Sequence, residues 1–133
     1  MNVKLLFSIA LIGLSLQIAA CGRSEVSFSA DVQPILEVAC LECHNNTGEG
    51  VAASGFSVID YAAVMKGTKL GPAVIPGSSM SSTLYRVIAG KTDPEIRMPP
   101  HHDESLAEGR GVSLGAEQIE IIGVWIDQGA KNN

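Results

Sequence analysis

The chain has 133 residues, enough for one compact domain, and its formal net charge is −5. The acidic balance and the absence of a basic stretch argue against nucleic-acid binding. They also argue against adhesion to an anionic membrane by charge alone.

The first twenty residues have the pattern of a secretory signal. Met1 to Lys4 carries a single positive charge, an apolar run follows to Ile18, and two small residues, Ala19 and Ala20, precede Cys21. The apolar run is too short for a membrane span. We therefore expect residues 1–20 to be a signal peptide, and we expect export to the periplasmic side of the cell envelope.

Ile18-Ala19-Ala20-Cys21 also resembles the bacterial lipoprotein cleavage box. Cys21 would then be the lipidated first residue of the mature chain, and residues 21–27 would tether residues 28–133 to a membrane, because two or more acyl chains give a stable anchor. Gly22, in place of the Asp associated with inner-membrane retention, slightly favours the outer membrane. The alternative is that Cys21 is incidental and the signal is cut elsewhere.

A first helix is predicted before residue 40, with Ser29 or Asp31 as its cap and Pro34 near its first turn. Its apolar residues recur at helical spacing: Val32, Ile35, Leu36 and Ala39. Residues 45–55 are rich in Gly, Asn and small residues and are expected to form a loop.

Two short helices are predicted in the middle of the chain. Asp60 is expected to cap one that runs through Met65 and stops at Gly67. Residues 69–77 are expected to be irregular. The second helix is expected to begin at a cap, Ser79 or Ser81, and to end at Gly90, with a buried face formed by Leu84, Val87 and Ile88.

The last helix is predicted over residues 116–128, after a long loop at 91–112. Gly115 must cap it, Gly129 ends it, and Trp125 lies beside an apolar stripe of Ile119, Ile122 and Ile126. No segment alternates as a strand would. We therefore expect an all-α domain whose long loops are organised by function or by a bound group.

Cys40-Leu41-Glu42-Cys43-His44 is the strongest chemical signal in the sequence. Two Cys separated by two residues and followed by His is the pattern of c-type haem attachment, in which both sulfurs add across the vinyl groups and the His binds the iron. The pattern predicts one covalent haem c on Cys40 and Cys43 with His44 as the proximal ligand. A buried porphyrin would also supplement a core in which aromatic residues are only 5% of the chain.

Three other interpretations of the cysteine pair remain open. A redox dithiol is expected beside a βαβ pattern, which this sequence lacks. Zinc could be held by Cys40 and Cys43 together with His101 and His102, although structural zinc sites more often use matched pairs of ligands. A plain Cys40–Cys43 disulfide would make the chain a non-haem structural lipoprotein.

Met98 is the expected distal ligand. Pro99 and Pro100 follow it, so the chain around the thioether is extended and stiff. Among the other methionines, Met65 is expected in the core and Met80 on the surface. His101 and His102 are rival ligands; bis-His coordination would imply a lower reduction potential than His/Met coordination.

Over residues 26–130 the sequence resembles the class I cytochrome c family, and specifically its planctomycete-type domains. The resemblance is carried by residues 28–36, the 40–44 box, residues 61–66, 71–77, 84–86, Met98-Pro99-Pro100 and residues 122–130. It implies a class I cytochrome c fold, with helices around one covalent haem and with long loops, in which the first and last helices cross beside the haem and Trp125 packs there. It also implies the same attachment and ligand residues that the box and Met98 predict.

The expected function is electron transfer by a monohaem cytochrome, because an iron with both axial positions filled by protein has no open site for a substrate. We expect a carrier and not an enzyme, either alone or as a subunit of a larger oxidoreductase, with redox proteins as partners. The alternative is a haem-based ligand sensor or peroxidase-like enzyme whose iron has an open position.

Overall fold

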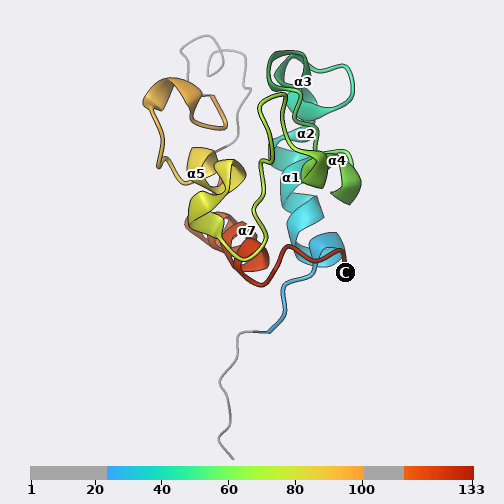
Figure 1. Ribbon diagram of the computed structural model, residues 1–133, viewed down its shortest axis with the longest axis vertical. Helices are drawn as coiled ribbons and strands as arrows, with labels where there is room; N and C mark the ends of the chain where they lie inside the picture. The colour runs from blue at the N-terminus through green and yellow to red at the C-terminus, as the bar shows by residue number, and fades with distance from the viewer. Residues whose placement is uncertain (1–23, 101–112) are drawn as a thin grey trace, which may run out of the picture.

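The computed structural model describes residues 24–100 and 113–133 (Figure 1). The predicted signal peptide, the predicted lipid anchor Cys21, and the rival ligands His101 and His102 lie outside the described residues.

The predicted all-α class is confirmed. The described residues form helices and no strand, and one isolated β-bridge joins Thr68 to Gly71. No helix in the described ranges is long and apolar enough to cross a membrane. The elements are η1 (Phe28–Val32), α1 (Gln33–Ala39), α2 (Leu41–His44), α3 (Glu49–Ser54), α4 (Tyr61–Lys66), η2 (Ser79–Ser81), α5 (Thr83–Ile88), η3 (Pro94–Ile96) and α7 (Ala116–Asp127).

The first helix is capped by Ser27, so the prediction of Ser29 or Asp31 as the cap was wrong. The Ser27 hydroxyl accepts a hydrogen bond from the Ala30 amide at 3.2 Å, while the Asp31 carboxylate accepts one from the Ser27 amide at 2.8 Å. The Ser27 and Asp31 side chains thus each accept from a backbone amide at the start of the helix, in the manner of a capping box. The π-helical turn η1 then continues into α1, where Pro34 lies in the first turn as predicted.

Residues 49–54 form the helix α3, which corrects the prediction of a loop over 45–55. The helix ends at Gly55, which has a left-handed backbone with φ of 79°. Beyond it, the Lys69 ammonium donates to the carbonyls of Ala52 and Ala53 at 2.6 and 3.2 Å. The Lys69 ammonium, from a distant segment, thus satisfies carbonyls at the end of α3. No pattern within residues 45–55 could have predicted that contact.

The next two helices follow the predictions closely. Asp60 caps α4 by accepting from the Ala63 amide at 2.7 Å, and Gly67 follows its last residue. The helix α5 begins after Ser82, one residue beyond the predicted caps, and buries Leu84 and Ile88 as expected. The buried Ser82 hydroxyl does not cap α5 but donates to the Ser78 carbonyl at 2.8 Å.

The last helix, α7, is anchored by an aromatic cluster. Trp125 is fully buried, and its ring centroid lies 5.3 Å from that of Phe28 in η1 and 6.4 Å from that of Tyr61 in α4. Its indole N–H donates to the Lys131 carbonyl at 2.9 Å, and the Tyr61 hydroxyl donates to the Ala130 carbonyl at 2.9 Å. The predicted contact between the first and last helices is therefore present, and Trp125 lies within it. Gly115 caps α7, and its amide donates to the Gln118 side chain at 2.9 Å.

The two ends of the described chain lie together. The Val26 amide donates to Gln128 Oε1 at 2.8 Å, the Phe28 amide donates to Asn133 Oδ1 at 2.9 Å, and Lys131 forms an ion pair with Glu25. Figure 1 places this end of the molecule opposite α3, with α1 running between the two. The residues that precede η1 are thereby fastened to the segment that follows α7.

Candidate functional site

The helices α1 and α2 bring the three residues of the predicted haem box into one turn. Cys40 follows the last residue of α1, and its carbonyl accepts hydrogen bonds from the amides of Cys43 and His44 at 3.2 and 2.9 Å. The side chains of Cys40, Cys43 and His44 are each half-buried. The Cys-x-x-Cys-His residues therefore form one compact helical turn directly after α1. The face of α1 that bears its buried residues packs in the core.

The two sulfurs are not joined in a disulfide. Burial raises the pKa of the Cys40 thiol to about 11, and the neighbouring Cys43 adds to this. Cys40 is therefore a neutral thiol at neutral pH. The Cys43 thiol donates to the Glu49 carboxylate at 3.7 Å, which connects α2 with the first residue of α3.

The His44 ring is oriented by a backbone carbonyl. Its Nδ1 atom lies 2.8 Å from the carbonyl oxygen of Phe56. A carbonyl can only accept, so this bond places the hydrogen on Nδ1 and leaves the lone pair on Nε2. A histidine that binds a metal through one nitrogen usually donates its other N–H in this way, which fixes the tautomer and the ring orientation.

The segment 56–58 holds His44 at two points. Besides the Phe56 carbonyl on the ring, the Val58 amide donates to the His44 carbonyl at 2.9 Å. The Phe56 ring is buried and meets the imidazole edge to face, with centroids 5.6 Å apart and planes at 67°. Both the backbone and the side chain of His44 are therefore fixed by a segment twelve residues further along the chain.

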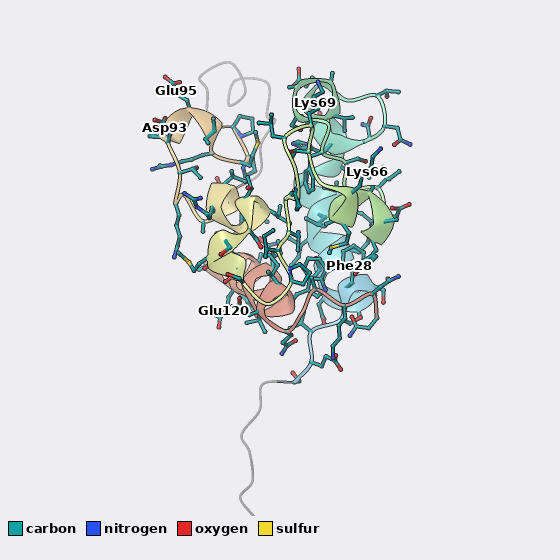
Figure 2. All side chains as sticks on the ribbon, viewed as in Figure 1. Phe28, Lys66, Lys69, Asp93, Glu95 and Glu120 are labelled. Carbon is teal, nitrogen blue, oxygen red and sulfur yellow. The ribbon has the colours of Figure 1, made fainter. Side chains whose placement is uncertain are left out.

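Met98 lies in the segment that follows η3, further along the chain than α5. Its amide donates to the Val87 carbonyl at 3.2 Å, its peptide bond to the buried Pro99 is cis, and its side chain is 37% exposed. Figure 2 shows Asp93 and Glu95 at η3 on the opposite side of the view from Lys66 and Lys69. Within the described ranges, no hydrogen bond or ring contact joins Met98 to the haem box.

Met65 and Met80 lie where the sequence predicts them. Met65 is partly buried against the core. Met80 is 57% exposed and accepts a hydrogen bond from the Lys91 ammonium at 3.5 Å. In the portion of the chain that the structure describes, no group of three or more His, Cys, Asp or Glu side chains is placed to hold a metal ion; the two histidines of the zinc alternative lie outside that portion.

Residues 40–102 match the family model described as Planctomycete cytochrome C, and the match runs from the first cysteine of the box past Met98. The chain carries a planctomycete-type cytochrome c domain. No curated protein and no solved structure matches it. A cytochrome c domain implies covalent haem c and electron transfer.

The donor set of this cytochrome domain fits haem c. Two thiols stand at the required spacing without a disulfide, and the imidazole beside them has its Nε2 lone pair free of the bond to Phe56. Met98 adds a soft thioether on a partly exposed side chain, a donor of the kind that haem iron accepts.

Sequence reasoning missed Phe56 and Gly50, which both lie against His44. The contribution of Phe56 is a main-chain carbonyl, which every residue carries, so no side-chain pattern could have revealed it. Gly50 stands in a Gly-rich stretch that was assigned to a loop, and its closeness to the imidazole depends on the helix α3.

Proposed function

We propose that the protein is a monohaem electron carrier in which Cys40 and Cys43 hold the haem, His44 is the proximal ligand and Met98 is the distal ligand. The observation that carries the proposal is the hydrogen bond from His44 Nδ1 to the Phe56 carbonyl within the haem box. That bond occupies Nδ1 and leaves Nε2 as the nitrogen available to a metal.

Each of these residues has a separate task. The two thiols fix the position of the haem by covalent bonds, and the 56–58 segment fixes the orientation of the imidazole. The bound haem supplies a one-electron change at its iron. Thioether coordination by Met98 raises the reduction potential relative to a second histidine. With both axial positions filled, the chain's remaining task is to exchange electrons with a partner at its surface.

Met98→Ala tests the distal assignment. Wild-type ferrous protein is expected to bind added carbon monoxide slowly, because Met98 must first leave the iron. Met98→Ala is expected to bind it at once and to have a lower reduction potential. The measurements are a carbon monoxide difference spectrum and a potentiometric titration that follows the reduced-minus-oxidised spectrum.

Met80→Ala is the matched control, because Met80 is also an exposed methionine of this half of the chain. It should leave both the spectrum and the potential unchanged. If Met98→Ala also left them unchanged, the distal ligand would be another group, such as His101 or His102. Immediate binding of carbon monoxide by wild-type protein would instead favour the ligand-sensing or peroxidase-like alternative.

We further propose that Cys21 anchors this cytochrome by lipid on the exported side of a membrane, after removal of residues 1–20. The support is the signal-like N-terminal sequence with its cysteine, together with the hydrogen bonds that fasten residues 26–28 to the segment after α7. A short tether would hold this end of the domain close to the bilayer.

Cys21→Ser is expected to release the cytochrome from membranes without removing its haem, because no acyl chain could then be attached. Fractionation of cells, with haem absorbance followed in the soluble and membrane fractions, measures this. Wild-type protein that is already soluble, or a Cys21→Ser variant that stays with the membrane, would contradict the anchor and leave the haem assignment intact.

A redox partner with a basic surface fits the haem-box half of the chain. Between residues 24 and 65 the sequence has no Lys or Arg. The same stretch contains the carboxylates of Glu25, Asp31, Glu37, Glu42, Glu49 and Asp60. Complementary charge would speed the encounter and orient the partner.

A further inference from the structure

Gly50 lies directly against the imidazole of His44. A Cβ atom added to Gly50 would be 2.8 Å from His44 Cε1, 2.8 Å from His44 Nε2 and 2.8 Å from the Cys43 carbonyl oxygen. All three distances are well inside van der Waals contact. A side chain at this position would therefore force one of its neighbours to move.

The neighbours are poorly able to move. The imidazole is held by its hydrogen bond to Phe56, so rotation of the ring away from Gly50 would stretch or break that bond. The Cys43 carbonyl is backbone within the turn that carries both cysteines. The helix α3 is itself held at its far end, where the Lys69 amide donates to the Ser54 carbonyl at 2.8 Å.

The backbone at residue 50 does not require glycine for its own conformation. Gly50 is the second residue of α3, and its φ lies outside the left-handed region that favours glycine. Inside a helix, glycine is less favourable than alanine by about 1 kcal/mol. The close approach to His44 and Cys43 is thus the physical reason why glycine suits this position.

We propose that Gly50 is a positioning residue for the proximal ligand. Because it has no side chain, the α3 backbone can close against the Cε1–Nε2 edge of His44 while the Phe56 carbonyl holds the opposite nitrogen. The hydrogen bond to Phe56 thereby sets the ring from one side, and residue 50 lacks the Cβ atom that would otherwise stand 2.8 Å from Nε2, the nitrogen that would bind the iron. This inference rests on the proposed role of His44 as an axial ligand.

Gly50→Ala in the haem-loaded protein tests the inference. A ring displaced by about 30° from its preferred rotamer is expected to shift the balance between bound and unbound His44 up to about tenfold. We therefore expect a larger high-spin fraction in the ferric spectrum and a changed reduction potential. A merely structural role would alter the unfolding midpoint and leave these two quantities at their wild-type values.

Gly115→Ala is the matched control, because an added Cβ there would meet only Gln118 Oε1, at 3.7 Å, and the backbone φ is −68°. It should leave the ferric spectrum and the potential as in wild type. If Gly50→Ala matched this control in both, Gly50 would have no positioning role.

A measurement on wild-type protein tests the inference even if the Gly50→Ala variant does not take up haem. In the reduced haem-loaded protein, a nuclear Overhauser effect is expected between the Gly50 α-protons and His44 Hε1, with the His44 ring protons strongly shifted by the porphyrin. Shifted His44 signals without that effect would overturn the inference alone. His44 signals at their ordinary positions would instead overturn the assignment of His44 as the ligand.

Discussion

Replacing Cys40 and Cys43 together with serine is expected to abolish covalent haem attachment. A serine hydroxyl has nearly the same size as a thiol, but it does not form the thioether with the vinyl groups on which the box depends. Wild-type protein should retain its haem after denaturation and extraction with acidified organic solvent, whereas the double variant should lose all of it. Intact-protein mass and haem absorbance of the extracted chain measure the difference.

The single variants and a distant cysteine make this test specific. Cys40→Ser and Cys43→Ser each leave one sulfur and should retain less haem than wild type, because one thioether at most can form. Cys21→Ser removes a cysteine outside the box and should leave haem content unchanged. A colourless wild-type protein whose mass changes only by reduction of a Cys40–Cys43 disulfide would eliminate the cytochrome proposal for this chain.

Trp125→Ala is expected to lower the free energy of unfolding by about 3 to 5 kcal/mol, the usual cost of removing a large buried aromatic side chain. Trp125 is fully buried and packs against Phe28 and Tyr61. The variant also loses the indole hydrogen bond to the Lys131 carbonyl. A domain of this size has only about 5 to 15 kcal/mol of stability, so the midpoint in guanidinium chloride should fall sharply.

Two further variants separate the contributions within Trp125→Ala. Trp125→Phe keeps an aromatic ring but lacks the N–H donor, and it should cost markedly less than alanine. Val38→Ala removes methyl groups from a side chain that is 75% exposed, and it should change the free energy of unfolding by less than about 0.5 kcal/mol. A Trp125→Ala variant as stable as Val38→Ala would show that the contact between η1 and α7 contributes little.

The parts of the fold that follow from near neighbours in sequence were predicted well. The cap of α4 at Asp60, its end at Gly67 and the glycine-capped helix α7 all appear in the structure. Each depends on residues within one helical turn of each other, where backbone geometry alone decides which groups can meet.

The errors arose at a helix that a distant side chain supports and at a helix start whose serine does not cap it. The helix α3 was expected to be a loop because its residues are small and Gly-rich, yet Lys69 satisfies its last carbonyls from fifteen or more residues away. The start of α5 was predicted at Ser79 or Ser81, but it lies at Ser82, whose hydroxyl donates to the Ser78 carbonyl. At α3 tertiary hydrogen bonds outweigh weak local preferences, whereas at α5 the Ser82 hydroxyl bonds a carbonyl four residues before it and does not cap the helix.

The sequence by itself determined the covalent chemistry proposed for this cytochrome, since the Cys-x-x-Cys-His spacing depends only on residues that are neighbours along the chain. It also marked Met98 as a candidate, through the two prolines that follow it. Only the tertiary structure decided how His44 is held. The Phe56 carbonyl and the bare backbone of Gly50 reach the ring because α3 folds back over α2, and neither group carries a side-chain signature that a sequence could display.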